Sequence, residues 1–199
     1  MKLRYGWLLA AVLLWTGCGK EERREAMSLC KVLGQKQADL AAINALEKDL
    51  LGSTREWCGG IVNNGAGKGK ALEENAASAK GLSQSAGVVA TQLSQVRQAI
   101  YDQPLKQEYT EGVRSTLINQ IMKRQKMLQA VRTALDASAA GFLESARSRA
   151  YKGDTYPPGI DKLNSLVSGY IGPEDAVGKA IADLKLKYSI QDAELAGKT

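Results

Sequence analysis

The chain has 199 residues, of which 44% are hydrophobic and 24% charged, and its formal net charge at pH 7 is +6. This length and apolar content are sufficient for a folded domain with a core. The sequence contains no histidine, which excludes catalytic triads, general bases and metal sites built on that side chain. Paired acids such as Glu73 and Glu74 lie where helix starts ordinarily place them. We therefore expect a protein that is not an enzyme and that holds neither a cofactor nor a metal.

The first residues have the order of an export signal, in which a positive segment, an apolar run and two small residues precede a cysteine. These parts are Lys2 with Arg4, the run from Trp7 to Trp15, the pair Thr16-Gly17, and Cys18. About nine apolar residues fall short of the ~20 that a membrane-spanning helix needs. An N-terminal membrane anchor and an ordinary signal peptide cut elsewhere are the two alternatives.

Two small residues followed by cysteine after an apolar run resemble the lipobox of bacterial lipoproteins, with Trp15 where that family usually has leucine. The resemblance implies cleavage before Cys18 and a lipid-modified, palmitate-bearing cysteine, whose acyl chains would anchor the protein stably. Gly19 in place of an aspartate implies the outer membrane. The expected organisation is a cleaved signal peptide at 1–17, a lipid anchor with a short spacer at 18–28, and one helical domain at 29–199. Cleavage removes two positive charges from +6 and leaves a basic mature chain of +4.

The two remaining cysteines, Cys30 and Cys58, form an even pair in an oxidising compartment, which predicts a disulfide bond. Two buried free thiols are the alternative, and a metal pair has little support without histidine. An unbroken helix from Cys30 to Leu51 would keep the two sulfurs too far apart. The disulfide therefore requires a break in the first helix, which we expect at Gly34.

Apolar residues recur at helical spacing along the mature chain with almost no strand-like alternation, which predicts an all-α fold. A first helix is expected over residues 21–51, ended by Gly52. The sequence Ser53-Thr54-Arg55-Glu56 has the form of a capping box and predicts a separate short helix that stops at Asn63-Asn64-Gly65.

A second helix is expected over residues 70–101, where apolar or small residues recur every seven positions as in a coiled-coil seam. They are Leu72, Ala79, Ala86, Leu93 and Ile100. The near absence of charge favours a central helix that is covered on both flanks. The alternative is a one-sided helix with a serine- and glutamine-rich face toward solvent.

A third helix is expected over residues 107–151, after a turn at Asp102-Gln103-Pro104. The same seven-residue spacing recurs in it at Ile121, Leu128, Leu135 and Phe142. A short helix over 161–170 and a last helix opened by Gly172-Pro173-Glu174-Asp175 should follow. The predicted architecture is an elongated antiparallel helical bundle, or coiled-coil hairpin, of three long helices, with the short C-terminal helices packed near one end.

Five basic residues and no acid occur between Gly112 and Leu135 of the third helix, which predicts a positively charged stripe. They are Arg114, Lys123, Arg124, Lys126 and Arg132. Such a stripe suits an anionic lipid surface, an acidic glycan or an acidic protein, and the alternative is an ordinary solvated helix face. No aromatic residues alternate with the basic ones, so we expect no binding to nucleic acid.

Two loops are further candidates for binding. The glycine-rich loop before the second helix carries Lys68 and Lys70; it lacks the spacing of a phosphate-binding loop, but its amides and lysines could hold an anion at the helix start. A solvated loop is the alternative. The segment with Tyr151, Tyr156 and Pro157-Pro158 could serve in recognition or simply pack on its own helices.

These features favour a lipid-anchored envelope protein that scaffolds, pilots or adapts a periplasmic or surface assembly through an envelope protein partner. A binding protein for an anionic ligand is the alternative. The substrate class, the partner and the oligomeric state are not specified by any motif in the sequence.

Overall fold

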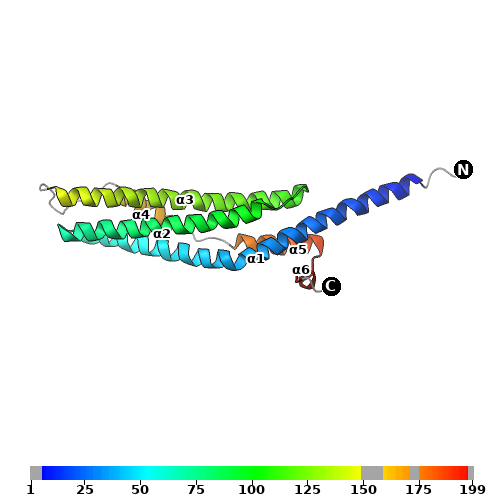
Figure 1. Ribbon diagram of the computed structural model, residues 1–199, viewed down its shortest axis with the longest axis horizontal. Helices are drawn as coiled ribbons and strands as arrows, with labels where there is room; N and C mark the ends of the chain where they lie inside the picture. Colours follow the sequence, from blue (N-terminus) through cyan, green and yellow to red (C-terminus); the bar gives the residue numbers. More distant parts are fainter. Residues whose placement is uncertain (1–5, 149–158, 171–174, 197–199) are drawn as a thin grey trace. The chain divides into compact units, whose positions relative to one another are not determined.

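The computed structural model describes residues 6–148, 159–170 and 175–196, with side chains from Gly19 onward. The described residues contain helices and no strand (Figure 1). The helices are α1 (Gly6–Asn64), α2 (Lys70–Tyr101), α3 (Glu108–Arg147), α4 (Ile160–Ser168), α5 (Ala176–Tyr188) and α6 (Asp192–Leu195). The predicted all-α fold of three long helices followed by short C-terminal helices is confirmed.

The chain divides into two compact units, and the three long helices contribute to both. Unit 1 comprises Met1–Asp39, Arg97–Asn119 and Asp175–Thr199, and unit 2 comprises Leu40–Val96 and Gln120–Glu174. Each unit therefore combines segments that are distant in the sequence, and each is described separately below.

Helix α1 is longer and more continuous than expected. It runs without interruption through Gly34, Gly52 and the segment 53–56, so the predicted break, the predicted end and the separate short helix are wrong. Thr54 does not cap a helix: its hydroxyl donates a hydrogen bond to the Leu50 carbonyl oxygen at 2.7 Å, one turn earlier in the same helix. Residues 19–28, expected as a spacer, are also helical, and Ala26 within them is fully buried.

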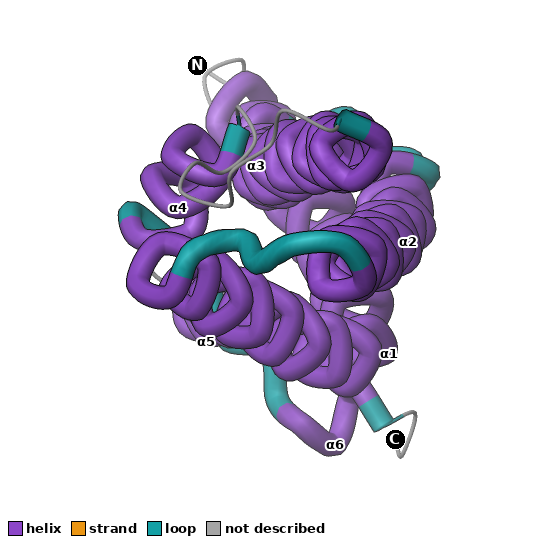
Figure 2. Tube along the Cα trace, turned by 90° about the vertical axis from the view of Figure 1, so that its left-hand side faces the viewer, coloured by secondary structure: helices purple, strands orange, loops and turns teal. Residues whose placement is uncertain are grey.

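The seven-residue patterns of α2 and α3 supply much of the core of unit 2. Figure 2 shows α2 and α3 side by side there, with α4 next to α3. One cluster joins all four helices of this unit through Leu51 and Cys58, Ala79, Val131 and Leu135, and Leu163 and Val167. A second cluster surrounds Phe142, whose ring meets that of Trp57 edge-on at 5.9 Å between centroids. The predicted heptad seams are therefore confirmed as buried surfaces.

Gly159 allows the chain to enter α4. Its φ of 115° is in a region that side chains disfavour, and an added Cβ would lie 3.3 Å from the Ser138 hydroxyl oxygen. Beyond it, Ile160, Leu163 and Val167 are buried, and Arg55 donates a hydrogen bond to the Val167 carbonyl oxygen at 2.6 Å. Helix α4 is thus held within unit 2 at both of its ends.

Unit 1 contains the N-terminal part of α1, the turn between α2 and α3, and helices α5 and α6. Asp175 caps α5 by accepting a hydrogen bond from the Gly178 N–H at 2.8 Å. Helix α5 turns one apolar face inward, on which Val177, Ile181 and Leu184 are buried. Buried residues of α1 in this unit include Leu29 and Leu33.

Some predicted features lie outside the described residues. They are the C-terminal end of the third helix at 149–151, the Tyr151, Tyr156 and Pro157-Pro158 segment, and the Gly172-Pro173-Glu174 start of the last helix. Among the residues that are described, none of the helices has a long enough apolar stretch to cross a bilayer.

Candidate functional site

Arg124, predicted in the basic stripe, instead belongs to a buried polar cluster in unit 2. Its guanidinium contacts the carboxylate of Glu47, which is fully buried, with Nε at 3.0 Å from Oε2, and it also donates to Asn44 Oδ1 at 2.7 Å. The second Glu47 oxygen accepts a hydrogen bond from the Tyr170 hydroxyl. Burial, together with this hydrogen bond and the Glu47 charge, raises the pKa of Tyr170, so the phenol remains a donor. Every member of this cluster has a hydrogen-bond partner within it. These bonds connect α1, α3 and the segment after α4.

Arg114 is also turned inward, within unit 1. Its guanidinium donates hydrogen bonds to the carbonyl oxygens of Tyr101 at 3.1 Å and Gln103 at 2.6 Å, and it pairs with Glu111 one turn earlier. Its side chain is only 14% exposed. Arg114 therefore fixes the turn between α2 and α3 and satisfies carbonyl groups at the end of α2.

Three members of the predicted stripe remain on the surface. Lys123 and Lys126 are exposed, and neither has an ion-pair partner among the described residues. The Arg132 side chain is half exposed, 4.0 Å from the Asp136 carboxylate. The continuous five-residue stripe predicted from the sequence is thus wrong, because two of its arginines bind internal partners.

The loop with Lys68 and Lys70 is a tight connection between α1 and α2. Gly65, Gly67 and Gly69 have positive φ, and a Cβ at Gly67 would come within 2.7 Å of Ala71. Asn75 holds the loop by donating a hydrogen bond to the Ala66 carbonyl oxygen at 3.1 Å. Lys70 is highly exposed and lies 3.3 Å from Glu74. The three glycines are therefore explained by the geometry of the turn.

The predicted disulfide between Cys30 and Cys58 is not present. Both residues are free and buried, and both lie in the uninterrupted helix α1. At about 1.5 Å of rise per residue, the helix separates them far beyond the ~6 Å between Cα atoms that a disulfide requires. Burial raises the pKa of Cys58 to about 11, and burial also raises that of Cys30 despite the opposing charge of Lys185. Two unreactive thiols replace the expected bridge.

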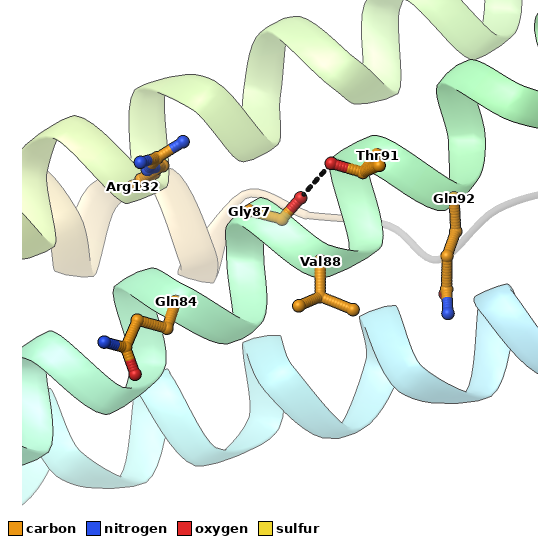
Figure 3. A pocket seen from close by; sticks show the side chains of 6 residues that line it. All are labelled: Gln84, Gly87, Val88, Thr91, Gln92 and Arg132. Atoms are coloured by element: carbon orange, nitrogen blue, oxygen red, sulfur yellow. Dashed lines mark hydrogen bonds between the residues drawn. The ribbon is translucent and has the colours of Figure 1, made fainter.

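An open groove runs along α2 in unit 2, with a volume of about 410 Å³. Its lining residues are Gln84, Gly87, Val88, Thr91, Gln92 and Arg132. Figure 3 shows five of them on successive turns of α2 and Arg132 reaching from α3. The Thr91 hydroxyl donates to the Gly87 carbonyl oxygen at 2.9 Å, and the absence of a side chain at Gly87 leaves room for Arg132, whose Nη1 would lie 3.6 Å from a Cβ there. We call this feature the α2 groove.

The exposed face of α2 beside the groove carries no charge over four turns of helix, whereas Arg132, which also lines the groove, is a charged residue of α3. No residue between Lys80 and Arg97 is charged, and the exposed ones are Gly81, Gln84, Ser85, Val88, Thr91 and Gln95. Val88 is 55% exposed, and Gln92 Oε1 is buried without a hydrogen-bond partner among the described residues. Helix α2 therefore exposes one face to solvent. The expectation that neighbouring helices cover it on both flanks is not met on this face. The lack of charge visible in the sequence was the signal for this surface.

No group of three or more metal-binding side chains occurs in the part of the chain that the structure describes. Cys18 lies in α1, and its side chain is outside the described ones, so lipid attachment there stays a prediction. No protein-family model, curated protein or solved structure matches this chain.

Proposed function

We propose that this chain is a non-enzymatic, lipid-anchored adaptor of the cell envelope, which binds a protein partner through the α2 groove. The observation that carries the proposal is the uncharged exposed face of α2, with Val88 at its centre. Interface cores are depleted in charged residues, whereas ordinary exposed helix faces are rich in them. The lipobox resemblance at Cys18 supports the envelope as the compartment and the outer membrane as the site of attachment.

Site-specific crosslinking tests the adaptor function directly. A photoreactive amino acid at Val88 should form a discrete adduct with an envelope protein in intact cells. The same amino acid at Leu143, an exposed leucine of α3 in the same unit, is the matched control and should form none. A Val88→Lys variant should lose co-purification of the same partner, because an unpaired charge is costly in an interface core, whereas Leu143→Lys should retain it. Equal adducts at both positions, or none at Val88, would contradict the proposal.

The lipid anchor has its own test. Cells fed a labelled fatty acid should incorporate the label into the wild-type chain and not into Cys18→Ala. The mature protein should begin at Cys18, which mass spectrometry of the purified chain measures. A labelled Cys18→Ala variant would exclude this attachment site.

An anionic ligand remains a second candidate because Lys123 and Lys126 are exposed and have no ion-pair partner among the residues with described side chains. Charge reversal at these two lysines should abolish salt-sensitive binding to anionic vesicles or acidic glycans. Arg124 is unsuitable for this test, since it partners a buried carboxylate. Binding that survives the double reversal would exclude this candidate.

A further inference from the structure

Leu186 is the most exposed large apolar side chain described, with 84% of its surface accessible. It lies in the last turn of α5, whose buried residues are Val177, Ala180, Ile181 and Leu184. Two residues beyond Leu184, it projects about 200° around the helix, away from the buried face. Packing within unit 1 therefore does not account for Leu186.

The end of α5 is fixed to the part of α1 that follows Cys18. Arg23 of α1 donates hydrogen bonds to the carbonyl oxygens of Tyr188 at 3.1 Å and Ser189 at 3.4 Å, and it forms an ion pair with Glu194 at 2.7 Å. Ser189 has a positive φ of 51° at the C-cap of α5. These contacts hold the corner that follows Leu186 against α1 at Arg23.

Arg23 follows Cys18 by only five positions. Five residues span about 7.5 Å in a helix and at most about 18 Å when extended. Acyl chains on Cys18 would place its sulfur at the boundary between headgroups and hydrocarbon, and apolar residues of interfacial helices enter this boundary by about 5–10 Å. The C-terminal turn of α5 is therefore within reach of the bilayer surface.

The end of α5 and the part of α1 after Cys18 both carry exposed basic residues. Lys187 is exposed beside Leu186, with its ammonium 3.2 Å from the centre of the Tyr109 ring. Lys20 and Arg24 are exposed on the part of α1 that follows Cys18, and the exposed Glu21 lies between them. Asp183 lies one turn earlier on α5 and limits the contact to the C-terminal turn. An exposed leucine flanked by basic residues is the composition of interfacial membrane contacts.

We propose that Leu186 and Lys187, with Lys20 and Arg24, form a contact between unit 1 and the anionic phospholipid surface that holds the acyl chains of Cys18. The inference rests on the proposed lipid anchor. The contact would add a second attachment point beside the acyl chains and would set the orientation of unit 1 against the membrane.

The test uses the full, acylated chain in vesicles of phosphatidylethanolamine and phosphatidylglycerol. A Leu186→Cys variant is labelled with an environment-sensitive fluorophore. The buried Cys30 and Cys58 and the acylated Cys18 leave position 186 as the reactive thiol. The matched control is a labelled Leu46→Cys, because Leu46 is exposed but belongs to unit 2. We expect a blue shift at position 186, with loss of most of the emission when the vesicles contain nitroxide-labelled lipid, and neither change at position 46.

The possible failures are distinguishable. Mass spectrometry before reconstitution shows whether the acyl chains are present; their absence overturns the lipid anchor and this inference with it. If the acylated protein floats with the vesicles while the label at 186 stays in water, the membrane contact is overturned and the lipid anchor stands. Shielding of the label in native membranes but not in pure lipid vesicles also overturns it, because a protein would then cover Leu186.

Discussion

Each unit contains a glutamate whose carboxylate accepts several hydrogen bonds, but the two carboxylates differ in burial and in the kind of donor. In unit 2, the Glu47 carboxylate is fully buried and accepts hydrogen bonds from the side chains of Arg124 and Tyr170. In unit 1, Glu25 is only partly buried and accepts from the backbone N–H groups of Lys106 at 3.0 Å and Gln107 at 3.0 Å. A buried charge is costly when it loses its partner, whereas a capping carboxylate near the surface can be replaced by water. We therefore expect unit 2 to respond to loss of charge partners and unit 1 to respond to pH.

The largest effect should come from Arg124→Ala, which leaves the buried Glu47 carboxylate without its charged partner. We expect a loss of about 3–5 kcal/mol in the free energy of unfolding, measured by urea denaturation. Replacing both residues by methionine should recover part of this loss, because the desolvated charge is removed together with its partner. A loss below about 1 kcal/mol for Arg124→Ala would mean that the pair is not buried as described.

A smaller effect, with a distinct pH dependence, is expected for Glu25→Gln in unit 1. Burial raises the pKa of Glu25, but hydrogen bonds from Lys106, Gln107 and Thr110 outweigh it and lower the pKa below its usual value. The stabilisation is therefore present above about pH 4 and lost as pH falls through the lower folded pKa.

We expect Glu25→Gln to cost about 1 kcal/mol at pH 7, as for loss of a helix cap, and to converge with the wild type in acid. Hydrogen exchange of the amides in residues 106–112, followed against pH, measures this locally. Glu21→Gln is the matched control, because Glu21 is an exposed acid of the same helix that caps no backbone N–H among the described residues; we expect its profile to follow the wild type. A loss for Glu25→Gln that is independent of pH would contradict the contrast between the two units.

The smallest effect should be that of reductant. Because both thiols are free, dithiothreitol should leave the thermal midpoint unchanged, in contrast to the shift that loss of a disulfide produces. Denatured, unreduced protein should take up alkylating reagent at both Cys30 and Cys58. Uptake at these positions only after reduction would show that the two cysteines form a disulfide after all.

The long helices could be predicted because their seams repeat every seven residues. The continuity of α1 could not, because Gly34 and Gly52 are poor helix formers that cost about 1 kcal/mol each relative to alanine. Burial of Leu33, Leu40, Leu50 and Leu51 beside them outweighs this cost. The two glycines, as local signals for a helix break, are therefore outweighed by tertiary packing, which is not visible in the local sequence.

The candidate site was predicted in part. Counting charges along the third helix did not separate Arg124 from Lys123 and Lys126. Helical spacing could have done so, since Arg124 follows Ile121 by three residues and precedes Leu128 by four, which places it on the buried face. Its partner Glu47 lies on the apolar face of α1 in the same way, four residues after Ile43. The α2 groove was less predictable, because absence of charge fits both a covered helix and a binding surface.

The uncharged face of α2 also determines how a partner would be released. Coulombic contacts weaken as ionic strength rises, but contacts between uncharged groups are not screened and are strengthened by salts such as sulfate. A complex formed through α2 should therefore withstand high-salt washes that remove proteins bound to Lys123 and Lys126. It should dissociate instead on cooling or in mild urea, which weaken the burial of apolar surface.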